Sequence, residues 1–377
     1  RSVKAFLLSG SKWNGFGLAV QAYQKSVLSI IDYAIELAQT YDKHLHVRLV
    51  KGAYWDTEIK QAQIDGLDSY PVYTRKSNTD VSYLACAQKL LAHRDVIYPM
   101  FGTHNAYSVA AIMNMAGSDK SGFEFQKLFG MGDALYEALI KVESVNVCVY
   151  APVGSYEELL PYLVRRMLEN GANSSFVNQL YDKDYSPEDM AFDVVEKVRN
   201  NNQKSHPKIP LPKNLYGERR QNSLGIDLND PIVFDALENR IKTEFSNKQY
   251  KANPLIANHK ASENTREKKQ SPASKLDIVG YVAYAHKNDV EKVMENAKSG
   301  FQIWSNTSAD ARAHSLEKFA DALEENTLEL ISLCCREGGK TIKDGLDEVR
   351  EAVDFCRYYA MNGRVQFDEA GIKLPGP

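Results

Sequence analysis

The sequence predicts an α/β protein: an incomplete (β/α)8 barrel of the TIM-barrel type with about five β/α units, then a linker and a mainly helical second part. Apolar runs of strand length alternate with longer helical patterns, which is typical of parallel β/α units rather than hairpins. Polar residues gather directly after these runs, where such barrels place their chemistry. A proline-containing polar stretch then separates two regions of different pattern, and 377 residues favour two domains.

The first part is predicted from the periodicity of its apolar residues. Strands are expected near residues 17–23, 45–51, 97–103, 122–128 and 145–151. Helical spacing is found in VLSIIDYAIELAQTY, DVSYLACAQKLLAHR, SVAAIMNMA and YEELLPYLVRRMLENG. Asp80 and Ser155 are predicted to cap helix N-termini, and Gly171 is predicted to close the last of these helices.

The second part begins after a polar, proline-containing segment. We predict a first domain over residues 1–200, a linker over 201–228 and a second domain over 229–377. Within the second domain, residues 258–275 are predicted to form a surface loop and DIVGYVAYA a strand. The remaining stretches, which include DVEKVMENAKSGFQIWS and DEVREAVDFCRYYA, have helical periodicity.

Composition and charge exclude several classes of function. The net charge is −3 and no basic stripe is interleaved with aromatic residues, so nucleic acid is not an expected partner. The five cysteines form no CxxC pair, and no metal site is expected. No apolar run reaches the roughly 18 residues of a membrane span, which favours a cytoplasmic location.

Polar side chains follow nearly every predicted strand. One such residue alone has an ordinary explanation as a hydrogen-bonded core group or a helix cap. Clusters at the same relative place on several strands instead favour an active site at the C-terminal face of a barrel. The clusters are Gln21 and Tyr23; Arg48, Lys51 and Tyr54; Thr103, His104 and Asn105; Gln126; and Tyr150.

The adjacent arginines of LVRRMLENGAN suggest a carboxylate ligand. Neighbouring residues diverge by about 100° on a helix, so Arg165 and Arg166 do not share one solvated face. Glu169 lies four residues after Arg165, the spacing of a supporting ion pair, but one carboxylate cannot saturate two guanidinium groups. A substrate carboxylate would complete the set. The alternative is a solvated arginine pair on an amphipathic helix.

Long motifs of the first part resemble a known family. RLVKGAYWD, YPVYTRK, TDVSYLACA, THNA, FEFQ, YAPVG and LVRRMLENGANSSFVN resemble the proline dehydrogenase domain of the proline utilization A family over about residues 15–177. The second part is similar to the N-terminal portion of aldehyde dehydrogenases, chiefly in REGGKT and EVREAVDFCRYYA.

The resemblance implies a bifunctional flavoenzyme. In this family a (β/α)8 barrel holds FAD and oxidises L-proline to pyrroline-5-carboxylate, and the electrons pass to a membrane quinone. The complete parent protein would also contain an NAD-dependent glutamate-semialdehyde dehydrogenase, so NAD is expected only there. A homo-oligomer that is cytoplasmic, and peripherally membrane-associated when reduced, is implied as well.

The resemblance also assigns roles to matched residues. Arg48, Tyr54, Tyr150, Arg165 and Arg166 are the implied catalytic residues. The FAD-binding set comprises Gln21, Arg48, Val50, Lys51, Gly52, Ala53, Thr103, His104 and Asn105. The proline-binding set comprises Tyr54, Leu128, Tyr150, Arg165, Arg166 and Glu169.

Two other functions remain open at this stage. One is a carboxylate-binding lyase or aldolase that uses Lys51 as a Schiff-base amine. The other is a non-catalytic scaffold, in which the arginine pair is only surface. The family's early barrel strands would precede Arg1, and its dinucleotide site and catalytic cysteine would follow the last residue. We therefore expect this chain alone to fold poorly and to have no aldehyde-oxidising activity.

Overall fold

The computed structural model describes residues 2–8, 12–171, 193–257 and 266–367. The chain divides into two compact units, which are treated separately below. Unit 1 contains residues 1–59 and 70–209, and unit 2 contains residues 60–69 and 210–377.

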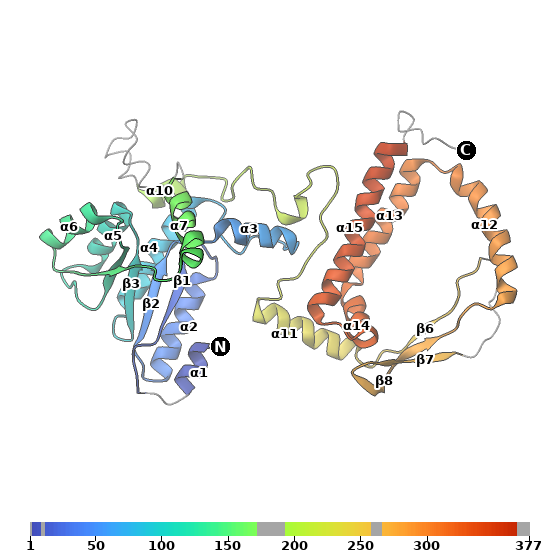
Figure 1. The fold of residues 1–377 in the computed structure, drawn as a ribbon, viewed down its shortest axis with the longest axis horizontal. Coiled ribbons are helices and arrows are strands. Elements are labelled where there is room, and N and C mark those ends of the chain that lie inside the picture. Colours follow the sequence, from blue (N-terminus) through green and yellow to red (C-terminus); the bar gives the residue numbers. More distant parts are fainter. Residues whose placement is uncertain (1, 9–11, 172–192, 258–265, 368–377) are drawn as a thin grey trace. The chain divides into compact units, whose positions relative to one another are not determined.

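Unit 1 is built on a parallel sheet of five strands in the order β1-β2-β3-β4-β5. Each strand pairs in parallel with the next one along the chain (Figure 1). The predicted parallel α/β architecture is therefore confirmed, and every strand ends within two residues of its predicted end. The strands are β1 (Gly17–Gln21), β2 (Leu45–Val50), β3 (Ile97–Gly102), β4 (Glu124–Leu128) and β5 (Asn146–Tyr150).

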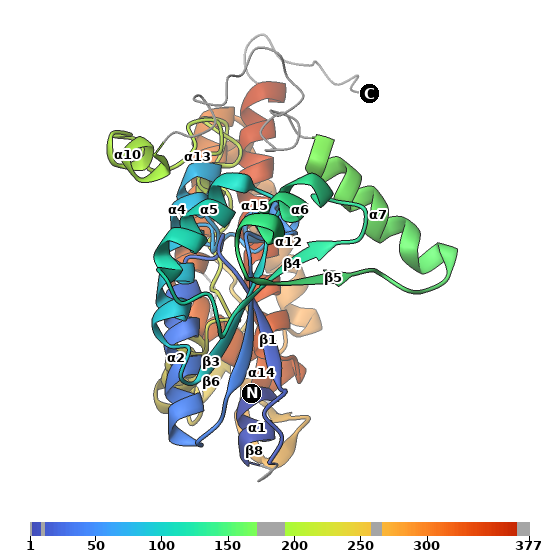
Figure 2. The same ribbon diagram turned by 90° about the vertical axis from the view of Figure 1, so that its left-hand side faces the viewer.

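Helices connect these strands and cover one side of the sheet. Figure 2 shows α2, α4 and α5 side by side along the strands. The helices of unit 1 are α1 (Ser2–Leu8), α2 (Val27–Thr40), α4 (Lys76–Ala92), α5 (Ala106–Ala116), α6 (Asp133–Val142), α7 (Tyr156–Gly171) and α10 (Val194–Arg199). A further helix, α3 (Trp55–Ile64), begins in unit 1, and its residues from Lys60 onward belong to unit 2.

Side chains along β2 and β3 alternate between buried and partly buried positions. In β2, Leu45, Val47 and Leu49 are buried in the core with helical residues such as Ile31. The residues between them are only partly buried, and β3 repeats this pattern. Because successive side chains of a strand point to opposite faces, Arg48 lies on the face away from the helices.

Two details of the local prediction need correction. Asp80 does not cap a helix, because α4 begins at Lys76 and Asp80 lies inside it, where its carboxylate pairs with Lys51. Residues 258–275 are not one loop: β7 occupies residues 267–271 and β8 begins at Ser274, while residues 258–265 lie outside the described part.

The predicted N-cap of α7 is present. Ser155 Oγ accepts a hydrogen bond from the Glu158 backbone N–H at 3.4 Å, and the Glu158 carboxylate accepts one from the Ser155 N–H at 2.9 Å. This reciprocal capping box fixes where the chain turns from β5 into α7.

Unit 2 combines a small sheet with long helices. Its sheet has the order β6-β8-β7, with β6 parallel and β7 antiparallel to β8. No described helix in either unit is long and apolar enough to cross a membrane. The elements of unit 2 are η1 (Pro212–Asn214), α11 (Pro231–Arg240), η2 (Ile241–Phe245), β6 (Tyr250–Ala252), β7 (Glu267–Ser271), β8 (Ser274–Val282), η3 (Lys287–Asp289), α12 (Val290–Ser305), α13 (Ala309–Glu325), α14 (Thr327–Gly338) and α15 (Ile342–Phe367).

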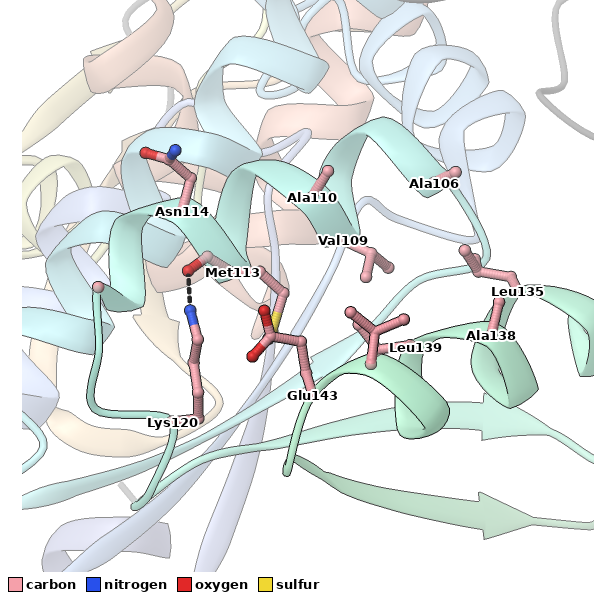
Figure 3. A pocket seen from close by; sticks show the side chains of 12 residues that line it. Ala106, Val109, Ala110, Met113, Asn114, Lys120, Leu135, Ala138, Leu139 and Glu143 are labelled. Atoms are coloured by element: carbon pink, nitrogen blue, oxygen red, sulfur yellow. Dashed lines mark hydrogen bonds between the residues drawn. The ribbon is translucent and has the colours of Figure 1, made fainter.

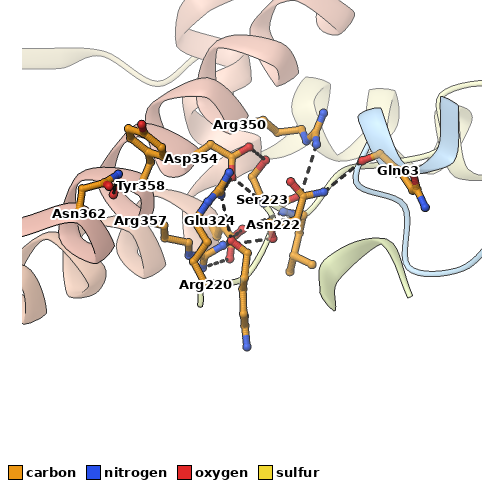
Figure 4. Close-up of polar contacts among 12 residues, drawn as sticks. Gln63, Arg220, Asn222, Ser223, Glu324, Arg350, Asp354, Arg357, Tyr358 and Asn362 are labelled. Carbon is orange, nitrogen blue, oxygen red and sulfur yellow. Dashed lines mark hydrogen bonds and ion pairs between the residues drawn. The ribbon is translucent and has the colours of Figure 1, made fainter. Parts of the chain in front are cut away.

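A buried arginine on α15 joins the main helix pair of unit 2 (Figure 4). Both terminal nitrogens of Arg357 donate to the Glu324 carboxylate of α13, at 2.9 and 2.8 Å, and one also reaches Asp321 at 2.9 Å. The same Glu324 carboxylate accepts the backbone N–H of Leu224 at 2.8 Å. These bonds fasten the segment before α11 to the two helices.

Candidate active site

Arg48 of β2 reaches across β3 to residues of β4 and β5. Its Nε donates to Gln126 Oε1 on β4 at 2.7 Å, and its guanidinium carbon lies 5.1 Å from the centre of the Tyr150 ring, at the end of β5. Gln126 Nε2 in turn donates to Glu124 Oε1 at 2.7 Å. The positive charge of Arg48 is thus fixed in place on the face opposite the helices.

Gly102 leaves room for this arginine to cross β3. A Cβ atom at position 102 would lie 3.2 Å from Arg48 Nη2 and 3.0 Å from Val50 Cγ1. Both separations are tighter than ordinary van der Waals contact. A residue without a side chain therefore suits the strand that lies between Arg48 and Gln126.

The segment after β2 folds back against β1. Gln21 Oε1 accepts the Ala53 backbone N–H at 3.3 Å, and the Lys51 carbonyl accepts the Tyr23 N–H at 2.8 Å. Gly52 has φ +138°, and a Cβ there would lie 2.3 Å from Tyr23 Cδ2. Only glycine fits this close approach of backbone to ring.

Lys51 forms an ion pair with helix α4. Its Nζ lies 2.5 Å from Asp80 Oδ1 and 5.7 Å from the centre of the Tyr83 ring. The two charged side chains are partly buried, and Tyr83 is fully buried. The lysine charge is therefore placed beside the end of β2 by residues of another element.

The segment after β3 is fixed by its own hydrogen bonds. Asn105 caps α5, because its Oδ1 accepts the Ser108 N–H at 2.9 Å. Thr103 Oγ1 accepts the Asn105 N–H at 3.1 Å, and the Thr103 carbonyl accepts the Tyr136 hydroxyl at 2.6 Å. This segment holds His104 next to the end of β4.

His104 is neutral for two reasons. The Leu128 backbone N–H donates to His104 Nε2 at 3.2 Å, so that nitrogen carries no proton. Burial lowers the pKa of His104, and the positive charges of Lys127, Arg166 and Arg48 lower it further. Protonation would replace an accepted hydrogen bond with repulsion.

We expect His104 to make stability fall as the pH drops below about 6.5, the pKa of histidine in an unfolded chain. Above that pH the side chain is neutral in both states. Below that pH the histidine of the unfolded chain binds a proton, whereas His104 in the folded chain does not. Proton binding therefore stabilises the unfolded state relative to the folded state. Urea unfolding at pH 7.5 and 5.5 should show a smaller decrease in the free energy of unfolding between the two pH values for His104→Asn than for the unaltered chain.

The control for this measurement is His314→Asn, because the His314 side chain is 59% exposed. That variant should keep the full loss of stability between the two pH values. An equal loss in the His104→Asn variant and the unaltered chain would contradict a role for His104.

Helix α7 brings its arginines to aromatic rings. The guanidinium carbon of Arg165 lies 4.7 Å from the centre of the Tyr54 ring, just after β2, and that of Arg166 lies 5.6 Å from the centre of the Tyr162 ring. Tyr54 is 49% exposed, so its ring is open to a ligand. The contact between Arg165 and Tyr54 shows that α7 returns to the carboxyl end of β2. The predicted partner Glu169 lies outside the described side chains.

Several residues of this site were not found from the sequence. Tyr162 precedes Arg166 by four residues, the spacing of neighbours on a helix, and this signal could have identified it. Asp80 and Tyr83 were hidden because their role depends on how α4 packs against β2. Tyr136 supports Thr103 from α6, a helix that was not predicted.

A hollow of unit 1 with a largely apolar lining lies away from these strand ends. It lies between α5 and α6 and is lined by residues such as Val109, Met113 and Leu139 (Figure 3). Its volume is about 740 Å³. It contains none of the predicted site residues. We place the candidate site at the strand ends because the charged and hydrogen-bonding groups gather there. Among the described residues, no cluster of His, Cys, Asp and Glu could hold a metal ion.

Comparison with protein families gives two matches on the chain. Residues 3–179 match the model of proline dehydrogenase, and residues 259–373 match that of the aldehyde dehydrogenase family.

Comparison with individual proteins gives relatives that contain both regions. The chain is 45% identical to the bifunctional protein PutA of Salmonella typhimurium and 46% identical to that of Escherichia coli, over 97% of its own length. It spans 28% of the length of each of these relatives. A crystal structure of Bradyrhizobium japonicum proline utilization A matches with a TM-score of 0.80 at 43% identity, covering 100% of this chain and 35% of the other.

Proposed function

Because residues 3–179 of this chain belong to the proline dehydrogenase family and residues 259–373 to the aldehyde dehydrogenase family, we propose that unit 1 binds FAD and oxidises L-proline to pyrroline-5-carboxylate. The observation that carries the proposal is the contact of Arg165 with Tyr54 at 4.7 Å, which brings a carboxylate-binding group to the end of β2, where Arg48 is also held.

The donor set at the strand ends fits a flavin. Arg48 would offer a fixed positive charge to a bound flavin, which would supply two-electron chemistry. Gln21 keeps its amide group next to the Ala53 backbone, and Gly52 lets the backbone approach closely. The proposed FAD-binding residues are Gln21, Arg48, Val50, Lys51, Gly52, Ala53, Thr103, His104 and Asn105.

The substrate side of the site suits a small apolar ring that carries a carboxylate. Arg165 and Arg166 would bind the carboxylate of L-proline. The sequence adds Glu169 as their partner, but its side chain lies outside the described part. Tyr54, Leu128 and Tyr150 cover the pyrrolidine ring and exclude water. Tyr150 already stacks against the Arg48 guanidinium, which joins the substrate wall to the cofactor side.

The reaction converts one C–N bond of L-proline, between the ring nitrogen and C5, to a C=N bond. Two electrons and two protons leave the substrate. Bound FAD supplies the two-electron acceptor. Arg165 and Arg166 hold the substrate in one orientation, which lowers the entropic part of the barrier. Arg48 stabilises the negative charge that develops on the acceptor side.

The test is an absorbance spectrum of the chain reconstituted with FAD, recorded before and after L-proline is added. We expect the absorbance bands of a bound flavin, and we expect L-proline to bleach them. Pyrrolidine is the matched control, because it has the same ring without the carboxylate, and it should leave the bands unchanged. In a sample that circular dichroism shows to be folded, absence of bound flavin, or bands that L-proline does not bleach, would contradict the proposal.

A Schiff-base reaction at Lys51 is disfavoured. The Lys51 amine would have to reach a substrate carbonyl, and the Asp80 carboxylate already lies 2.5 Å from it. Borohydride added with a carbonyl substrate should therefore trap no adduct at Lys51.

The remaining parts of the proposal concern the larger protein. We assign residues 1–200 to the proline dehydrogenase domain, 201–228 to a linker, and 229–377 to part of an NAD-dependent glutamate-semialdehyde dehydrogenase domain. We further propose a quinone at the membrane as the electron acceptor, a homo-oligomeric state, and a cytoplasmic location with peripheral membrane association when reduced. The domain assignment rests on the family matches, and the electron acceptor, oligomeric state and location rest on the sequence resemblance alone.

A further inference from the structure

Lys51 is held both by its backbone and by its side chain. The Lys51 backbone carbonyl accepts the Tyr23 N–H at 2.8 Å, which joins the end of β2 to the end of β1. At the tip of the side chain, the ammonium pairs with Asp80 Oδ1 at 2.5 Å and faces the ring of Tyr83. A lysine side chain is normally flexible, so this degree of restraint needs an explanation.

Both partners of the ammonium come from one face of α4. Asp80 and Tyr83 are three residues apart, so they are neighbours on the helix surface. Tyr83 is fully buried and cannot move aside, and the Lys51 and Asp80 side chains are only 26% and 19% exposed. Together, Asp80 and Tyr83 restrict the position of the Lys51 ammonium.

A need for stability alone does not account for this pair. Taking a lysine and a carboxylate partly out of water costs much of what their attraction returns, and apolar side chains would serve packing as well or better. Lys51 directly precedes Gly52 in the sequence, and at Gly52 the backbone lies close to the Tyr23 ring. A placed charge at this position is useful when a negatively charged group binds there.

We propose that Asp80 is a positioning residue for FAD binding, which acts by holding the Lys51 ammonium at the carboxyl end of β2. Asp80 itself does not touch the cofactor. This inference rests on the proposed function, since it requires that FAD binds at these strand ends.

The test is a double-mutant cycle on the dissociation constant of FAD, measured by the change in flavin fluorescence on binding to the full chain. Lys51→Met and Asp80→Asn should each raise the dissociation constant roughly tenfold. The double variant should bind no more weakly than Lys51→Met alone, because Asp80 has nothing left to position. Asp80→Glu, which keeps the carboxylate, should recover most of the affinity.

The matched control is Asp32→Asn. It removes the ion pair between Asp32 and Lys89, which also involves α4 but lies near its other end. This variant should leave the dissociation constant unchanged. Circular dichroism of every variant reports whether the fold is retained.

Three outcomes would overturn the inference. If Asp80→Asn leaves FAD affinity unchanged, the pair serves only the fold. If Asp80→Asn weakens binding equally with and without Lys51, Asp80 does not act through that residue. If the unaltered chain binds no FAD, the proposed function fails, and this inference fails with it. The first two outcomes require binding by the unaltered chain, so they are distinguishable from the third.

Discussion

Replacing Arg165 and Arg166 together with methionine is expected to lower kcat/KM for L-proline by roughly 10²–10⁴-fold. Each charge-assisted hydrogen bond to a carboxylate contributes about 1.5–3 kcal/mol, so two of them contribute about 3–6 kcal/mol. Every 1.4 kcal/mol or so corresponds to a factor of ten. Methionine keeps an apolar side chain of similar length, so the loss reports on charge and hydrogen bonding.

Steady-state kinetics with L-proline would measure this effect, and the flavin spectrum would show whether the cofactor remains bound. The single variants should each lose less, and their losses need not add, because both arginines are proposed to bind one carboxylate. Arg240→Met is the matched control, since Arg240 is an exposed arginine of unit 2 that pairs with Glu244. Unchanged kinetics in the double variant would show that the arginine pair is only surface.

Replacing Gly52 with alanine is expected to lower the free energy of unfolding by about 2–6 kcal/mol. One part of the cost is backbone strain, because φ is +138° at this position. The other part is a clash, because the new Cβ would lie 2.3 Å from Tyr23 Cδ2. Tyr23 is 2% exposed and its hydroxyl donates to Glu58 at 3.4 Å, so the ring has little freedom to yield.

Urea unfolding of the Gly52→Ala and Gly130→Ala variants would separate the cost of backbone strain from the cost of the clash with Tyr23. Gly130 also has a positive φ, of 78°, but a Cβ there would meet nothing within 4 Å. Its replacement should cost only the conformational part, about 1–2 kcal/mol. If Gly52→Ala destabilises the chain no more than Gly130→Ala, the contact with Tyr23 is not a constraint.

Much of the sheet was predictable because local signals agreed with the fold. The apolar runs of β2 and β3 are buried from the helix side, so their pattern is strong. Helix α3 was missed because WDTEIKQAQI is mostly polar and gives little apolar periodicity. Helix α6 was missed because its N-cap, Gly132, has a left-handed conformation and no capping side chain.

The position of the polar residues at the strand ends was predictable from the sequence, but the residues they contact were not. Polar residues after the strands are visible in the sequence, and parallel strands bring them to one edge. The bond between Arg48 and Gln126 joins residues 78 positions apart and depends on the register of two strands. The pairing of Lys51 with Asp80 depends on the packing of α4, which propensity and periodicity do not specify.

The bond between Arg48 and Gln126 also bears on the order of assembly. Arg48 and Gln126 belong to strands that are separated by β3, so the bond forms only after all three strands have paired in register. A shift of β4 by one residue would turn Gln126 to the opposite face. The charge of Arg48 is therefore placed only when β2, β3 and β4 are all paired in the native register.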